Sequence, residues 1–231
     1  MREIIIGDIH GCNAALNKLL AKLQPDPRAD KLIFLGDLFD RGSNSWEVFK
    51  TVQSLCSAFG ANFVLLRGNH EDYLLQDKLS LFQRLTWKRV GRDASVRSFK
   101  QHGERFEACA PWIRSCSATF YNGSGFCCVH AGLKVYPPEM NDSFTLMHDH
   151  DVTLRNSYAG PLAICGHIAL DAPKWFAGDR KTVKELPYDE ELPLPERGII
   201  CLDTGCGKGG WLTGMTIDNA SYRLYGALDK S

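Results

Sequence analysis

The sequence lacks an excess of charge of either sign. Its 231 residues include 27 Lys and Arg and 27 Asp and Glu, so the formal net charge is zero. A balanced charge provides no field over the whole molecule that would draw it to nucleic acid or to a membrane surface. We therefore find no strong nucleic-acid signal and expect any bound anion to be held by a local group of residues.

Long apolar runs are also missing. No stretch approaches the roughly 20 apolar residues of a membrane-spanning helix, and residues 1–3 lead directly into a strand-like segment instead of the apolar region of a signal peptide. We expect a protein of the cytoplasm with no membrane partner. Nothing in the pattern indicates an oligomeric state.

Paired cysteine motifs are absent although nine cysteines are present. Their number is odd, their spacing is irregular and no Cys-x-x-Cys occurs, so neither a zinc knuckle nor a disulfide framework fits. Thiols in apolar strand-like runs, such as those of Cys165 and Cys201, usually behave as small buried hydrophobes. Cys12 and Cys206 adjoin polar motifs, and their sensitivity to oxidants is left open.

The first third of the chain alternates strand and helix patterns. Apolar runs at 2–6, 32–35 and 63–66 predict strands, and segments 13–23 and about 44–58 predict helices. This order predicts right-handed crossovers and helices packed on the faces of a sheet. Each strand ends in a polar loop that contains glycine, and such loops meet at one rim of an α/β sheet. The three loops are GDIHG at 7–11, GDLFDRG at 36–42 and RGNHE at 67–71.

The rest of the chain predicts a helical insertion followed by further strands. Residues 72–115 have helical character, and the acidic, proline-rich segment 187–197 is typical of a surface loop. No internal repeat occurs, so we expect a single domain over 1–231. The predicted later strands are 118–121 and 126–129, which form a hairpin, and 162–165, 198–202, 211–217 and 221–226.

Asp8 and His10 suggest a metal site. They follow a β-branched strand, and residues two apart in an extended segment project to the same side. Five ordered motifs then carry a family resemblance. The run GDIHG, GDLFDRG, GNHE, VHAGL at 129–133 and GH at 166–167, with DTG at 203–205, closely resembles the calcineurin-like metallophosphoesterases. Within them it resembles the phosphoprotein phosphatase branch, which includes small bacterial and phage Ser/Thr phosphatases and symmetrical diadenosine tetraphosphatases.

The resemblance implies an α/β fold, a metallophosphoesterase β-sandwich with flanking helices and a βαβαβ core that carries a dinuclear metal site. Asp37 would bridge the two divalent ions, which lower the pKa of a bound water so that hydroxide attacks phosphorus in line. The ligand types suit manganese, with iron or zinc as alternatives. The implied metal ligands are Asp8, His10, Asp37, Asn69, His130 and His167.

The same resemblance implies the residues that handle the phosphate group. Arg41 and Arg155 would clamp its oxygens together with Asn69, and His70 would protonate the leaving group while Asp40 orients the imidazole. Asn69 and His70 are neighbours in what we expect to be an extended loop, so they should point in different directions.

Three functions fit these motifs. The first is a phosphomonoesterase, favoured as a Ser/Thr protein phosphatase of broad specificity because a short chain leaves little room for a nucleotide-binding cap. Its substrates would be phosphoproteins or small phosphoesters. The alternatives are a symmetrical dinucleoside polyphosphate hydrolase and a non-catalytic metal or phosphate sensor. The basic stretch 84–105 and the run HDHD at 148–151 are interpreted as solvated surface.

Overall fold

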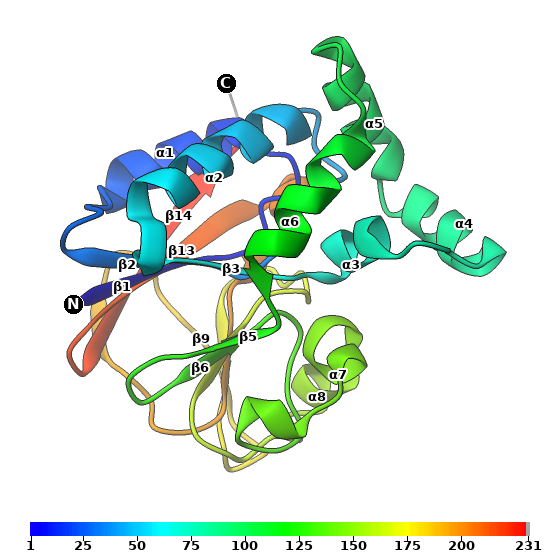
Figure 1. Ribbon diagram of the computed structural model, residues 1–231. Coiled ribbons are helices and arrows are strands. Elements are labelled where there is room, and N and C mark those ends of the chain that lie inside the picture. The colour runs from blue at the N-terminus through cyan, green and yellow to red at the C-terminus, as the bar shows by residue number, and fades with distance from the viewer. Residues whose placement is uncertain (230–231) are drawn as a thin grey trace.

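Two β-sheets face each other, and helices cover their outer faces (Figure 1). The structure is a computed structural model that describes residues 1–229. The strands are β1 (Arg2–Ile6), β2 (Asp30–Phe34), β3 (Phe63–Leu66), β4 (Ser117–Ala118), β5 (Phe120–Asn122), β6 (Cys127–Val129), β7 (Ala163–Cys165), β8 (Lys174–Phe176), β9 (Val183–Glu185), β10 (Glu191–Pro193), β11 (Ile199–Cys201), β12 (Asp203–Thr204), β13 (Trp211–Asp218) and β14 (Ser221–Leu228). The α-helices are α1 (Asn13–Leu23), α2 (Ser45–Phe59), α3 (Asn69–Leu75), α4 (Leu81–Arg89), α5 (Arg92–Gln101), α6 (Ala110–Cys116), α7 (Ser143–His148) and α8 (Asp151–Leu154).

The larger sheet contains the predicted βαβαβ unit. Its order is β10-β14-β13-β1-β2-β3-β4, with β12 paired to β13, and β1, β2 and β3 are parallel neighbours joined through α1 and α2. The smaller sheet has the order β5-β6-β7-β11-β8-β9, and β5 and β6 form the predicted antiparallel hairpin. The α/β sandwich implied by the resemblance is therefore confirmed.

Successive side chains of β1 pack into two different parts of the core, one on each face of the larger sheet. Ile4 and Ile6 pack with Leu16 and Leu19 under α1, whereas Ile5 packs in the core between the two sheets. Successive residues of a strand point to opposite faces, and burying each such side chain stabilises the fold by about 1.5–3 kcal/mol. This two-sided burial holds the polar loop after β1 in a fixed position.

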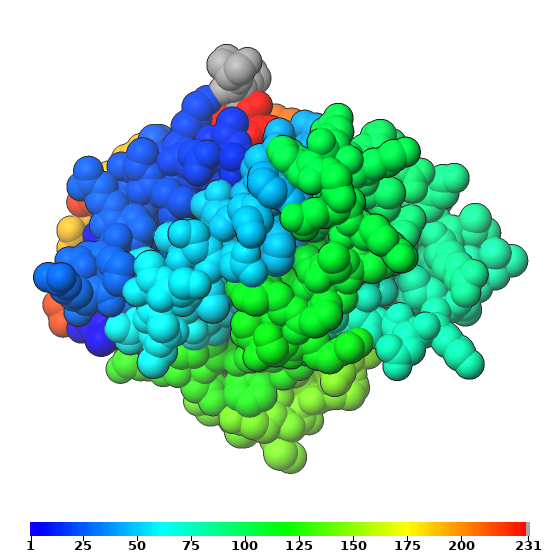
Figure 2. Space-filling view, turned by 45° about the horizontal axis from the view of Figure 1, so that its top comes forward, coloured from blue at the N-terminus to red at the C-terminus, as the bar shows by residue number. Residues whose placement is uncertain are grey.

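The segment between β3 and β4 is helical, in the region where the sequence predicts an insertion. It holds α3, α4, α5 and α6, which extend beyond the sheets on one side of the molecule (Figure 1). In the space-filling view, the segment that includes α4 projects at the right-hand edge (Figure 2). None of the helices in the described part of the chain has the length and apolar character needed to cross a bilayer.

One prediction about the later part of the chain was wrong, and two of its strands were not predicted. The segment 187–197 is not only a loop, because β10 pairs antiparallel with β14 at the edge of the larger sheet. An edge strand tolerates Pro193, which cannot donate a ladder hydrogen bond. The sequence analysis also missed β8 and β9, short strands that carry no clear alternation of apolar and polar residues.

Candidate metal centre

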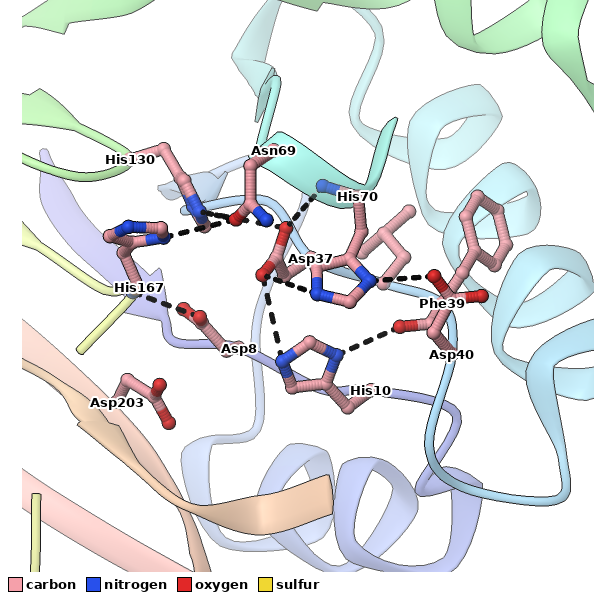
Figure 3. A network of polar contacts seen from close by, with 12 residues as sticks. Asp8, His10, Asp37, Phe39, Asp40, Asn69, His70, His130, His167 and Asp203 are labelled. Atoms are coloured by element: carbon pink, nitrogen blue, oxygen red, sulfur yellow. Dashed lines mark hydrogen bonds and ion pairs between the residues drawn. The ribbon is translucent and has the colours of Figure 1, made fainter. Parts of the chain in front are cut away.

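The carboxyl ends of six strands from both sheets deliver the polar residues of one site. The loops after β1, β2 and β3 converge as predicted, and the smaller sheet adds residues that follow β6, β7 and β11. Packing the two sheets together brings these loops to one end of the sandwich. The residues delivered are Asp8, His10, Asp37, Asp40, Asn69, His70, His130, His167 and Asp203 (Figure 3), together with Arg41.

Asp37 lies between two groups of potential ligands. Its Oδ2 is 3.5 Å from His10 Nε2, and its Oδ1 is 3.5 Å from His130 Nε2 on the other side. One ligand group joins His10, Asp37 and His70 and the other joins Asp37, His130 and His167, with ligand atoms within 4.8 Å of one another. A carboxylate shared by two groups is the arrangement that two cations about 3.5–4 Å apart require.

The imidazoles already have the hydrogen bonds that orient metal ligands. His10 Nδ1 donates to the Phe39 carbonyl and His130 Nδ1 donates to the Leu35 carbonyl, each at 2.8 Å, so each Nε2 is left as an acceptor. A backbone carbonyl commonly fixes the tautomer of a metal-bound histidine in this way. Burial lowers the pKa of His10, His130 and His167, so the neutral form with a free lone pair is favoured.

Several buried polar atoms of the site lack a hydrogen-bond partner among the described residues. They are Oδ1 of Asp8, Nε2 of His10, Nε2 of His167 and Oδ2 of Asp203. A buried polar group without a partner costs free energy, whereas a bound cation would satisfy these acceptors. Carboxylate, imidazole and amide donors without thiolate fit manganese, iron or zinc. The residues present therefore fit a pair of divalent ions.

The surroundings shift the pKa values of two carboxylates of the site in opposite directions. Burial raises the pKa of Asp8 well above its ordinary value, and the neighbouring Asp203 and Asp37 add to the rise. Burial would also raise the pKa of Asp37, but the imidazoles around it, that of His130 foremost, hold it below its ordinary value. Asp37 is therefore ionised at the centre of the site, and a cation beside Asp8 would oppose the rise in its pKa.

Glycines give the carboxylates room. A Cβ at Gly68 would collide with the Asp37 carboxylate, and a Cβ at Gly166 would collide with that of Asp8. Asp37 itself has φ of 49° and His167 has φ of 67°. Both values lie in the left-handed region, which residues other than glycine seldom adopt. Strain of this kind is concentrated at functional sites, where the surrounding structure holds it in place.

His70 is held by Asp40 on the side away from Asp37. His70 Nδ1 donates to Asp40 Oδ2 at 2.6 Å, and its Nε2 lies 3.8 Å from Asp37 Oδ2. Burial would lower the pKa of His70, but Asp37 and Asp40 raise it above its ordinary value. Trp87 Nε1 at 2.6 Å and Ser95 Oγ at 2.8 Å also donate to Asp40. The arrangement suits a histidine that keeps its proton, and sequence analysis missed its supporting residues on α4 and α5.

Asn69 and His70 diverge as predicted, but they do not lie in an extended loop. They begin α3, where successive residues are about 100° apart around the helix axis, so neighbours face different ways. Asn69 Oδ1 faces the ring nitrogens of His130 and His167 at 3.1 and 3.0 Å. Glu71 positions the loops, because its carboxylate accepts backbone N–H bonds from Gly68, Asp37 and Leu38.

A cavity of about 370 Å³ lies over this centre. Arg41 lines it, and the Nη1 atom of Arg41 is buried without a hydrogen-bond partner among the described residues. Lys208 also lines the cavity. Arg155 is not part of the lining; its side chain is 74% exposed and pairs with Asp151 at 3.1 Å. The Arg155 phosphate clamp stays a prediction from the resemblance.

The interpretation of the run 148–151 as solvated surface was wrong for His148, which is partly buried, and for Asp149, which is buried, whereas His150 and Asp151 are exposed. His148 and His150 both line the cavity, and the His150 ring lies 4.3 Å from that of His167. His148 Nε2 pairs with Asp72 Oδ2 at 3.0 Å. The packing of α7 beside α3 brings them to the site, and no local pattern in the sequence indicates that contact.

Asp203 is a site residue that sequence analysis did not assign. It is 1% exposed and follows β11, and its Oδ1 accepts a hydrogen bond from Gly205 N at 2.9 Å. Figure 3 shows its carboxylate beside that of Asp8. The position of Asp203 in the sequence could have indicated its role. Like Asp8 and Asp37, it follows an apolar strand and adjoins a loop that contains glycine.

This fold and a ligand set built around a shared carboxylate define a metal-dependent phosphoesterase. Residues 1–199 match the sequence profile described as Calcineurin-like phosphoesterase. The chain therefore belongs to this family of hydrolases, whose members use a dinuclear divalent-metal site.

Individual relatives and solved structures resemble this chain in sequence or in fold. A protein of Coxiella burnetii (strain CbuG_Q212) named "Bis(5'-nucleosyl)-tetraphosphatase, symmetrical" is 33% identical over 187 residues, which are 80% of this chain and 59% of that protein. The chain thus spans less than two thirds of the length of this relative. A metallophosphoesterase from Sphaerobacter thermophilus superposes with a TM-score of 0.64 at 16% identity, covering 98% of this chain and 88% of the other. A serine/threonine phosphatase from Saccharomyces cerevisiae gives 0.62 at 16% identity, covering 100% and 81%.

Proposed function

We propose that this chain hydrolyses dinucleoside polyphosphates symmetrically, converting diadenosine tetraphosphate into two molecules of ADP. The observation that carries the proposal is the 33% identity to a protein named as a symmetrical bis(5'-nucleosyl)-tetraphosphatase. The likeness to the yeast serine/threonine phosphatase, at 16% identity, concerns the fold alone. This reverses the preference of the sequence analysis for phosphoproteins, which rested on the shortness of the chain.

The proposed metal ligands are those that the resemblance implies, and manganese is the metal we propose. Two divalent ions at this site would activate a water molecule and neutralise phosphate charge. Asp37 would belong to both ions, consistent with its place in both ligand groups. We propose that Asp8, His10 and Asp37 hold one ion and that Asp37, Asn69, His130 and His167 hold the other.

The side chains around the metal ligands position the phosphate chain and supply a proton. The unpartnered Nη1 of Arg41 would donate to a non-bridging oxygen, and Lys208 would neutralise a neighbouring phosphate. Water adds to one central phosphorus while the bond from that phosphorus to the bridging oxygen breaks. His70 Nε2 gives its proton to that oxygen, and Asp40 stabilises the imidazole throughout. ADP is then the leaving group.

We infer that the reaction takes place in the cytoplasm. All nine cysteines carry free thiols, and seven of them are buried among core side chains. Such a set of thiols fits a reducing compartment.

The test is a comparison of substrates on the manganese-loaded protein. We expect a higher kcat/KM for diadenosine tetraphosphate than for a phosphothreonine peptide, with ADP as the single nucleotide product on anion-exchange chromatography. Asp37→Asn, which weakens the shared carboxylate, should abolish the hydrolysis and thereby assign it to this centre. Products of AMP and ATP, or a higher kcat/KM for the peptide, would overturn the proposal.

A further inference from the structure

A second hollow opens beside the cavity of the metal centre, and the two share the side chains of Tyr73 and His148. We call it the aromatic groove. It has a volume of about 370 Å³ and lies between α3, α4 and α7. Its lining consists of Asp72, Tyr73, Gln76, Phe82, Gln83, Ser143, Phe144, Met147 and His148.

Two phenyl rings of this groove are exposed although burial would be favourable. Phe82 on α4 is 78% exposed and Phe144 on α7 is 65% exposed. The Phe144 ring stacks on His148 with centroids 5.4 Å apart and planes 9° from parallel, and Tyr73 meets His148 edge to face at 5.9 Å. Exposed aromatic side chains that gather around a hollow mark a binding surface. The Phe144 and Phe82 rings offer free faces on which a planar group can stack.

Four polar side chains of the groove, those of Asp72, Gln76, Gln83 and His148, are already paired with one another. His148 pairs with Asp72, Gln76 Nε2 donates to Asp72 Oδ2 at 2.9 Å, and Gln83 Nε2 donates to Gln76 Oε1 at 3.0 Å. No lysine or arginine belongs to the lining among the described residues. The groove therefore offers aromatic faces without a free cation, whereas Arg41 and Lys208 line the adjoining cavity. A neutral planar group attached to a phosphate chain matches this division.

We infer that the aromatic groove binds one nucleobase of the dinucleotide while the phosphates occupy the metal-centre cavity. The inference rests on the proposed function and names where that substrate's nucleoside lies. Stacking on an aromatic ring accepts any base, because every base has a π-face. Since the groove amides are bonded to each other, adenine and guanine should bind with similar affinity.

Binding without turnover tests the groove separately from the reaction. Calorimetry on the manganese-loaded protein should show ADP binding more tightly than inorganic pyrophosphate, which has no base. Phe144→Ala and Phe82→Ala should each weaken ADP binding about tenfold, within the range of a lost stacking contact, and leave pyrophosphate binding unchanged. Phe144→Tyr should restore ADP affinity. Leu81→Ala is the matched control, because Leu81 neighbours Phe82, is 73% exposed and does not line the groove.

The outcomes separate this inference from the proposed function. ADP affinity that falls selectively in the phenylalanine variants supports the groove even if diadenosine tetraphosphate is a poor substrate. The inference would be overturned if ADP bound no better than pyrophosphate, or if the variants weakened the binding of both ligands equally. It would also be overturned if the variants raised KM for a phosphopeptide alone, because the groove would then be a peptide subsite. If both alanine variants bound ADP as tightly as the wild-type protein does, the inference would be overturned as well, even if the wild-type protein converts diadenosine tetraphosphate into two molecules of ADP.

Discussion

Asp40 shows how one carboxylate is fixed by residues from separate parts of the chain. It accepts hydrogen bonds from His70 on α3, Trp87 on α4 and Ser95 on α5, and it is fully buried. Hydrogen bonds to an ionised group are about twice as strong as those between neutral groups. The helical segment between β3 and β4 therefore holds His70, the proposed general acid, and also forms one wall of the cavity.

The substitution His70→Asn tests the role of this single residue. It removes the proton that Nε2 holds and should lower kcat on substrates with poor leaving groups by about 10²–10⁴-fold. Activated aryl phosphates, which need less protonation, should lose much less. The measurement is kcat for a phosphothreonine peptide and for an aryl phosphate, with manganese content as the control. Equal losses on both substrates at full manganese content would argue against the general-acid role.

At the scale of the element, the starts of β1 and β2 are joined by a charged pair. Arg2 and Asp30 face each other in the parallel register, and Arg2 Nε donates to Asp30 Oδ1 at 2.9 Å. Burial would raise the pKa of Asp30, but hydrogen bonds from Arg2 and from the backbone of Asp26 hold it below its ordinary value. The pair thus contributes stability that depends on the ionised carboxylate.

Asp30→Asn should lower the free energy of unfolding by about 1–2 kcal/mol at pH 7, toward the lower end because Arg2 is partly exposed. Since the folded-state pKa of Asp30 is depressed, this contribution is present above the unfolded-state value of about 4 and is lost as the pH falls through the folded-state pKa. Urea denaturation at pH 7 and near pH 3 should show the difference between wild type and variant shrinking.

The matched control for this measurement is Asp77→Asn. Asp77 also pairs with an arginine, Arg114, but its side chain is 96% exposed. The expected change is within about 0.5 kcal/mol, as for other exposed ion pairs. A gap between wild type and Asp30→Asn that stays constant from pH 7 to pH 3 would contradict a contribution from the ionised carboxylate.

For the whole molecule, the metal centre joins the two sheets at one end of the sandwich. Asp8 and Asp37 follow strands of the larger sheet, whereas His130 and His167 follow strands of the smaller one. Ions bound between them would favour the packed arrangement, because a ligand that binds only the folded state stabilises it. The centre would then contribute to stability as well as to catalysis.

Removing metal should therefore lower the thermal midpoint. At a free manganese concentration of about 100 times Kd, binding stabilises the fold by about 2.7 kcal/mol, which corresponds to a Tm difference of roughly 5–10 °C for a chain of this size. Thermal denaturation with manganese or with a chelator measures it. His10→Ala should show a smaller response to manganese, and a wild-type Tm that is the same in both conditions would contradict a structural role for the ions.

The sequence by itself determined the front half of the fold and most of the candidate centre. Strand patterns that end in polar glycine loops are local features, and parallel strands with short crossovers permit few arrangements, so β1, β2 and β3 and the convergence of their loops were predicted. The motifs also named residues such as Asp37 and His130, which the structure brings together. The extent of one domain over the whole chain remains a prediction of the sequence.

Tertiary structure alone decided the contacts between segments that are distant in sequence. Trp87 donates to Asp40, Asp203 lies beside Asp8, and α7 brings His148 to the cavity, while Arg155 lies outside its lining. Each of these placements depends on how helices and loops pack across the two sheets. Packing is determined by the summed burial of many side chains, so a local pattern of residues does not contain it.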